Sequence, residues 1–242
     1  PLLPKLRGCG CALRTIWVAE MIGSMFMSSE SIHWPEVVST SAMPKDYVRE
    51  LEKKGWWRPT LGRLVEPPRG SSMTAQHDYR LGYVRALASE HPKTMVFAGT
   101  TAAMILGHPV WPRLTDLHVY RMRGRRHLRR LRPHPNSKEP LLLRPMTAPP
   151  SLTTVLDMGR DVRVTTRQRT AVDVARLASS ETAFVAVCSI LGALATLGDT
   201  HMDRMNVVQY RERELRARTE MQRMADALAN RSGRQRARQI IS

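Results

Sequence analysis

Between residues 34 and 67, the order of apolar and polar positions predicts a helix followed by a hairpin. Pro44 suits the first turn of a helix, and a helical pattern continues from it to Gly55, a residue type that ends many helices. Val48 and Leu51 lie three residues apart, which predicts one buried face. Cations at four-residue spacing form another face, namely Lys45, Arg49 and Lys53. We therefore expect a helix with an apolar back and a cationic front.

The segments on either side of this helix complete a known order of elements. Residues 35–38 are interpreted as a helical turn, and the hydroxyl-rich residues 39–42 as a polar break. Residues 56–65 contain two extended runs around a turn at 60–62, which predicts a small hairpin. Helix, polar turn, helix and hairpin in this order predict a winged helix-turn-helix over residues 30–67, whose second helix would enter the major groove of DNA.

This interpretation gives each cation near the hairpin an expected role. Lys45 and Arg49 lie near the N-terminal end of the predicted recognition helix, where side chains of such helices reach base edges, and Lys53 lies on the same face. Arg58 and Arg63 flank the hairpin turn, so we expect them to contact phosphates or the minor groove.

The chain after residue 75 alternates between helical and extended patterns, which predicts a mixed α/β domain over residues 76–235 and an overall α+β fold. Residues 236–242 are interpreted as a tail after a helix stop at Gly233. The helices are expected at 76–90, 100–105, 166–177, 183–197 and 210–230, and the strands at 94–98, 117–122, 141–144 and 162–165.

Three of these helices carry more detailed expectations. Thr100 is expected to cap the helix that closes at Gly107. In the last long helix, Met221, Met224, Ala225 and Leu228 share an apolar face. The helix at 183–197 is largely apolar on all sides and is therefore expected to be buried, with these residues in helical register: Phe184, Cys188, Leu191 and Ala195.

Charge gives the first indication of function. The formal net charge is +17 and the sequence pI is about 11.0. Such a charge favours a polyanionic partner, most often nucleic acid and otherwise an anionic membrane surface. Together with the predicted winged helix, it makes double-stranded DNA the expected partner. No apolar run approaches the roughly 20 residues that span a bilayer, so no membrane association is expected. An arginine-rich coding bias would give the same composition without a polyanionic partner.

The cysteines and the N-terminal residues indicate in which cellular compartment the protein is expected. Three cysteines cannot build a disulfide framework, which indicates a reducing compartment and predicts a cytoplasmic protein. Cys9 and Cys11 have no second ligand pair at zinc-like spacing. Residues 1–29 only weakly suggest a signal peptide, because charges interrupt the apolar run. They are interpreted as a leader or an early helix, with Met21, Met25 and Met27 as alternative starts.

Seven arginines lie between residues 121 and 132, enough to neutralise several phosphates. Two interpretations stay open: a solvated hairpin tip, or an accessory element that contacts phosphates. This segment is expected to lack a rigid scaffold and hence to add affinity without sequence preference. Its candidate nucleic-acid contacts are Arg123, Arg125, Arg126, Arg129 and Arg130.

The helix that begins near Thr166 carries a second charged pattern. Asp173 lies four residues after Arg169 and three before Arg176, within side-chain reach on a helix. An anion or partner site would use such a group. The favoured interpretation is structural: a helix capped by a hydroxyl, whose Arg and Asp side chains hold each other against the sheet.

The residue types that enzymes need are scattered in this chain. The 21 acidic residues show no clustered carboxylates that would hold a catalytic metal. Histidines such as His77, His91, His108 and His201 are isolated, and no zinc-protease, phosphate-loop or serine-hydrolase motif occurs. We therefore expect neither an enzyme nor a cofactor.

Three segments together resemble the AbiEi family of antitoxins from type IV toxin–antitoxin systems. They are the winged-helix stretch ending in residues 48–65, the segment 97–109 with its glycine and proline, and the segment 162–176 with its threonine, Arg-Thr and Asp pattern. The resemblance implies a winged-helix transcriptional regulator that represses its own promoter, and a second domain that counteracts a nucleotidyltransferase-like toxin.

Two rival functions stay open. Many relatives of that family continue into an endonuclease domain similar to very-short-patch-repair nucleases, whose carboxylates have no counterpart in this sequence, which ends at Ser242. The chain could thus be the non-catalytic N-terminal portion of such an endonuclease. The other rival is a protein-interaction module whose charge is incidental.

Overall fold

A computed structural model describes most of the chain after residue 32 and places His33–Ser242 in one unit. The segment expected as a leader, residues 1–29, lies outside the described residues. The expected boundary between two domains near residues 67–76 stays a prediction. The described residues are 33–69, 72–92, 94–110, 116–121, 129–137, 140–146, 155–157, 162–196, 207–228 and 233–242.

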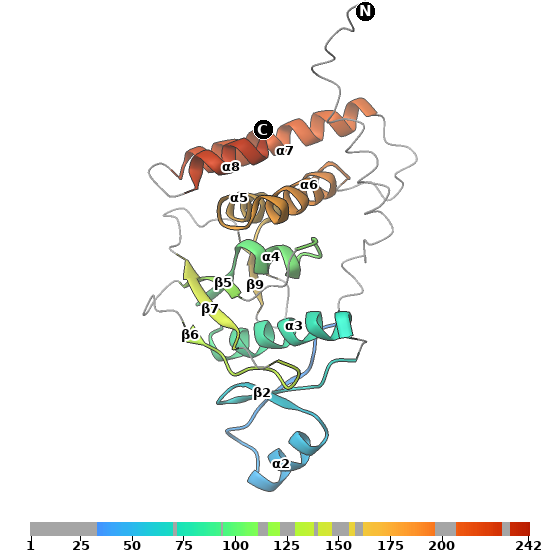
Figure 1. Cartoon of the computed structure of the whole chain (residues 1–242), viewed down its shortest axis with the longest axis vertical. Coiled ribbons are helices and arrows are strands. Elements are labelled where there is room, and N and C mark those ends of the chain that lie inside the picture. The colour runs from blue at the N-terminus through green and yellow to red at the C-terminus, as the bar shows by residue number, and fades with distance from the viewer. Residues whose placement is uncertain are drawn as a thin grey trace, which may run out of the picture. The chain divides into compact units, whose positions relative to one another are not determined.

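The first elements form a small antiparallel sheet with one helix (Figure 1). The predicted helix and hairpin are confirmed: the helix starts after Pro44 and ends before Gly55, which has a φ of 90°. Val48 and Leu51 are buried as expected and pack on Leu64. The elements are β1 (Val37–Ser39), α2 (Lys45–Lys53), β2 (Trp57–Thr60) and β3 (Arg63–Val65), and the strand order is β1-β3-β2.

The helical turn expected at residues 35–38 is wrong, because Val37–Ser39 is strand β1. Val37 pairs with Val65 and Val38 with Leu64. Two β-branched residues suit a pleated strand, and pairing with β3 satisfies backbone groups that a single helical turn would leave free. In the described part of the chain, one helix rather than two therefore precedes the hairpin.

Helix α3 (Ser72–Glu90) begins earlier than expected and lies between the small sheet and a larger one (Figure 1). Leu81, Val84 and Leu87 are completely buried. Gly82 lets α3 approach the small sheet, since a Cβ there would lie 2.8 Å from Val65 Cγ1. Burial on opposite faces explains why α3 lacks the one-sided apolar pattern of a surface helix.

The larger sheet is mixed, with β4 parallel to β9 and β5 parallel to β7. The four predicted strands are confirmed to within two residues at each end. The sequence pattern did not predict β6 and β8, which are too short to show a periodicity. The strands are β4 (Met95–Phe97), β5 (Asp116–Arg121), β6 (Arg129–Arg130), β7 (Leu142–Met146), β8 (Val155–Asp157) and β9 (Arg163–Thr165), in the order β6-β7-β5-β4-β9-β8.

Layers of helices cover the face of this sheet that lies away from α3 (Figure 1). The helix after Thr166 is confirmed with its cap, since the Thr166 hydroxyl accepts from the Arg169 backbone N–H. Met221, Ala225 and Leu228 are buried as expected, with Met224 packed beside them. The helices are α4 (Gly99–Ile105), α5 (Arg167–Leu177), α6 (Ser180–Thr196), α7 (Val207–Asp226) and α8 (Arg234–Ile241).

Three expectations about these helices are wrong. Phe184 is 58% exposed, because α6 packs through small side chains, including Ala183 and Ala186, that allow close approach to α4 and α5. Thr100 does not cap α4, because the N-cap residue is Ala98. The Thr100 hydroxyl is instead hydrogen-bonded to His118 Nδ1 at 2.9 Å. The expected tail at 236–242 lies mostly in α8, which buries Ala237 and Ile241.

The buried side chain of His108 is expected to make the stability of the fold depend on pH. Its Nδ1 lies 3.0 Å from the Ser189 hydroxyl, and burial, with help from the Arg167 charge, lowers the pKa of His108 to about 4. The unfolded chain, with an ordinary pKa of 6.5, binds the proton first as the pH falls. The contribution of His108 to the free energy of unfolding is therefore fully present above pH 6.5. As the pH falls from 6.5 to about 4, the free energy of unfolding decreases by up to about 3 kcal/mol.

Urea unfolding between pH 4 and 8 measures this loss. We expect the variant His108→Gln to lose less stability on acidification than the unaltered chain, because glutamine does not titrate. Equal acid slopes for the two proteins would show that His108 is not a buried neutral group.

Candidate nucleic-acid interface

A groove opens between α2, the turn before it and the hairpin. Its volume is about 340 Å³, and its lining combines apolar Met43 and Val48 with polar side chains. The helix contributes one flank and strand β2 the other. The groove is lined by Thr40, Met43, Lys45, Val48, Arg49, Glu52 and Arg58.

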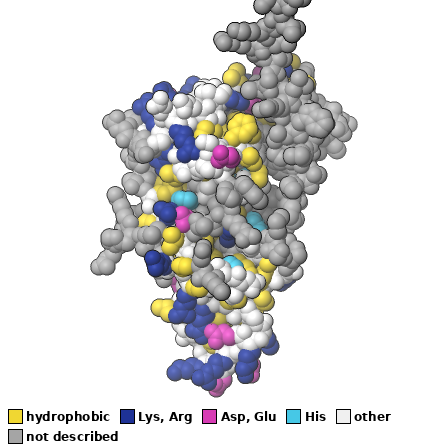
Figure 2. Space-filling model, in the orientation of Figure 1, with side chains coloured by type: hydrophobic (Ala, Val, Ile, Leu, Met, Phe, Trp, Pro, Cys, Tyr) yellow, Lys and Arg dark blue, Asp and Glu magenta, His cyan; other side chains and the backbone are white. Residues whose placement is uncertain are grey.

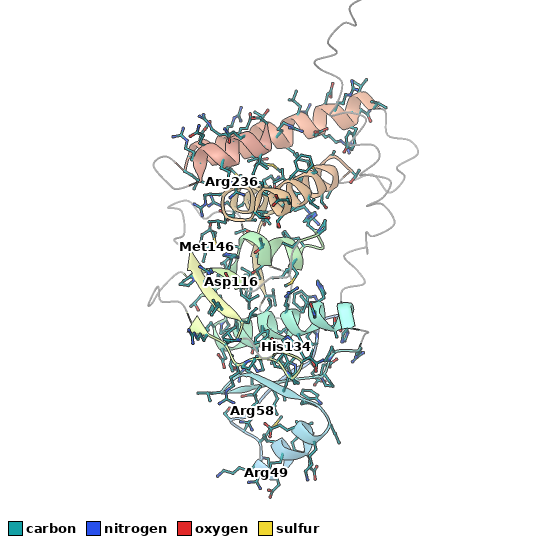
Figure 3. All side chains as sticks on the ribbon, in the orientation of Figure 1. Arg49, Arg58, Asp116, His134, Met146 and Arg236 are labelled. Atoms are coloured by element: carbon teal, nitrogen blue, oxygen red, sulfur yellow. The ribbon has the colours of Figure 1, made fainter. Side chains whose placement is uncertain are left out.

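Three of the predicted contacts, Lys45, Arg49 and Arg58, come together at this groove. The Arg49 side chain is 72% exposed and lies 3.4 Å from Asp46, and the Arg58 Nε donates to Glu52 at 2.6 Å. Exposed ion pairs of this kind are worth about 0 to 1 kcal/mol, so either cation can exchange its carboxylate for a phosphate at little cost. Figure 3 shows Arg49 and Arg58 at the same end of the described structure.

Acidic side chains limit the positive charge of α2. Asp46, Glu50 and Glu52 lie on the same nine-residue helix as its cations. Figure 2 accordingly shows basic side chains gathered over α2 and the hairpin with acidic ones among them. The cationic front expected from the sequence is therefore mixed in charge. Lys45 and Arg49 line the groove with Arg58 of β2, and Glu52 lies among them.

Two other predicted contacts lie away from the groove. Lys53 is exposed in the last turn of α2. Arg63 is engaged inside the fold, where its guanidinium donates to the hydroxyls of Ser39 and Ser89 at 2.7 and 2.8 Å. It also donates to the backbone oxygens of Gly62 and Ser89. Arg63 thus fastens the hairpin to α3, a role that its position beside a turn did not indicate.

The arginine-rich segment is described only at its end. Arg123, Arg125 and Arg126 lie outside the described residues. Arg129 and Arg130 form strand β6, paired with Leu143 and Leu142 of β7, and the Arg130 side chain is exposed. The expectation that the whole segment lacks a scaffold is therefore wrong for these two residues, because a strand pair fixes their backbone.

The charged pattern of α5 forms a buried network. Asp173 is completely buried and accepts hydrogen bonds from Arg169 Nε at 3.2 Å and from Arg169 Nη2 at 2.9 Å. The Tyr120 hydroxyl donates to both Asp173 oxygens, at 2.8 and 2.7 Å. Arg176 lies 3.8 Å from the same carboxylate. The sequence did not reveal Tyr120, which lies 53 residues away on β5.

Electrostatics fit a structural role for this network. Burial and the neighbouring Asp173 carboxylate raise the pKa of Tyr120, so the hydroxyl stays protonated and donates. Burial alone would lower the pKa of Arg169, but Asp173 and Tyr120 raise it, so the guanidinium stays charged. The Asp173 carboxylate, the Tyr120 hydroxyl and the Nε and Nη2 groups of Arg169 are hydrogen-bonded to one another, which fits a structural role for these three side chains.

Neither metal nor membrane features occur in the part of the chain that the structure describes. Within it, no three histidine, cysteine or acidic side chains gather closely enough to hold a metal ion. None of its helices is both long and apolar enough to cross a bilayer.

No protein-family model, curated protein sequence or solved structure matches this chain.

Proposed function

We propose that this chain is a DNA-binding transcriptional regulator whose DNA contacts are made by α2 and the β2–β3 hairpin. The observation that carries the proposal is the gathering of Lys45, Arg49 and Arg58 from a helix and a strand around one groove. The net charge of +17 supports a polyanionic partner, since it raises both affinity and association rate for DNA.

The arrangement of these elements favours a winged-helix mode of binding. In the sequence, α2 connects β1 to a hairpin, and in space β1 pairs with β3 of that hairpin. An α-helix with its side chains is about 10 to 12 Å in diameter, so the nine-residue α2 fits a major groove about 12 Å wide. The hairpin then lies beside α2 as a wing, with Arg58 directed at the phosphate backbone.

An antitoxin-like setting, in which the protein represses its own promoter and counteracts a nucleotidyltransferase-like toxin, is proposed from the three segments that resemble AbiEi antitoxins. The genomic neighbourhood tests it. A downstream nucleotidyltransferase-like reading frame would support the antitoxin, whereas an in-frame nuclease domain would support the endonuclease portion instead.

The DNA-binding proposal predicts a loss of discrimination in Arg49→Ala. Removing a contact to a base edge costs about 1 to 3 kcal/mol on the cognate site and much less on random DNA. The measurement is competition binding of the purified chain to its own upstream DNA and to a scrambled duplex. Arg223→Ala, an exposed arginine on α7, is the matched control and should leave both affinities unchanged.

Two results would contradict the proposal. One is equal binding of the unaltered chain to upstream and scrambled DNA at physiological salt. The other is full discrimination by Arg49→Ala, which would show that Arg49 does not contact base edges.

A further inference from the structure

Aromatic side chains join the hairpin to helix α3. The ring of Trp57, on β2, lies 4.7 Å from the ring of Tyr83 and 5.3 Å from that of Tyr79, in edge-on contacts. Both tyrosines belong to α3, and all three side chains are at most 6% exposed. Buried aromatic pairs of this geometry favour one relative position of the two elements. The hairpin therefore has a fixed position on α3.

The same helix holds the segment that follows β6. The Tyr83 hydroxyl donates to the Arg132 backbone oxygen at 2.5 Å, and the His134 ring stacks on Tyr79 at 4.2 Å. Leu131 is buried, and its backbone N–H donates to the Leu141 oxygen at 2.8 Å. Figure 3 shows His134 between the hairpin and the larger sheet. Residues 129–134 are thus fixed relative to the hairpin through Tyr79 and Tyr83.

This fixed segment carries positive charge and no acidic residue of its own. The side chains of Arg130 and Arg132 are both exposed. Residues 129–137 contain no Asp or Glu, whereas α2 contains three. Cations that meet no carboxylate in their own segment are suited to phosphate, and their long side chains on a strand end and loop are less suited to reading bases.

We propose that a duplex held at α2 also contacts Arg130 and Arg132 through its backbone phosphates, at an offset that the aromatic bridge Trp57–Tyr79–Tyr83–His134 fixes. This inference rests on the proposed DNA-binding function. It implies a contact surface longer than α2 and the hairpin, and an affinity that depends on duplex length.

The test compares the unaltered chain with the double variant Arg130→Ala/Arg132→Ala on duplexes centred on the cognate site, from about 10 to about 30 base pairs, or one to three helical turns. On the long duplex we expect the variant to bind about tenfold more weakly and its salt dependence to fall by about two phosphate contacts. On the shortest duplex that still binds, the two proteins should have equal affinity. The control Arg216→Ala/Arg223→Ala removes two exposed arginines of α7.

The outcomes separate this inference from the function on which it rests. If Arg49→Ala loses discrimination but the double variant matches the unaltered chain at every length, the extended contact is overturned and the proposed function stands. An equal loss on short and long duplexes also overturns it, because the arginines would then act within the α2 site. If the unaltered chain binds no duplex, both proposals fail.

Discussion

Replacing Asp173 with alanine is expected to lower the free energy of unfolding by about 3 to 5 kcal/mol. The substitution leaves the Arg169 guanidinium, which is 6% exposed, without its carboxylate. It also removes the acceptor of the Tyr120 hydroxyl and the charge nearest to Arg176. A buried cation without a partner is among the most costly defects that a single substitution can create.

Two conservative variants show which part of the network matters. Tyr120→Phe removes one hydroxyl from the carboxylate and is expected to cost less, about 1 to 3 kcal/mol. Asp173→Asn keeps the shape but not the charge, and should fall between Tyr120→Phe and Asp173→Ala. Urea unfolding gives the order of the variants. DNA affinity, corrected for the folded fraction, should not change, and an unchanged melting temperature with lost DNA or partner binding would instead identify a recognition site.

Elements with a strong local pattern could be predicted from the sequence. Pro44 and Gly55 bound α2, and Thr166 caps α5, because turn and cap chemistry acts over a few residues. Elements defined by distant partners could not. Val37–Ser39 is a strand because β3 pairs with it, and Phe184 is exposed because other faces of α6 pack on α5, α7 and α8. Such tertiary contacts override local preference.

The candidate site also has features that the sequence predicted and features that it could not predict. The cations of α2 and the hairpin were identified from helical spacing and turn position, and Lys45, Arg49 and Arg58 do line one groove. Spacing could not show that Arg63 binds Ser39 and Ser89, because these acceptors lie 24 and 26 residues away. Neither could it show that the segment after β6 is fixed, since Tyr79 and Tyr83 have no local pattern that points to His134 or Arg132.

Trp57→Ala is expected to destabilise the fold by about 3 to 5 kcal/mol, the usual range for removing a buried tryptophan. Trp57 is 5% exposed and contacts Tyr79 and Tyr83 edge-on. Its ring also lies against Gly82, where an added Cβ would be 3.0 Å away. Alanine does not fill this space between β2 and α3, so the substitution leaves a cavity.

Neighbouring substitutions make this prediction specific. Trp57→Phe keeps an aromatic ring, and the indole N–H that it removes has no hydrogen-bond partner among the described residues, so its cost should be much smaller. Trp56→Ala removes a half-buried ring from the cluster under α2 and should also cost less. Equilibrium unfolding in urea ranks the three variants, and equal losses for Trp56→Ala and Trp57→Ala would contradict the assigned packing. Trp57 also links the hairpin to the segment after β6. Under conditions where the Trp57→Ala variant remains folded, its DNA affinity should therefore no longer depend on duplex length. The DNA affinity of Trp57→Phe should keep this dependence.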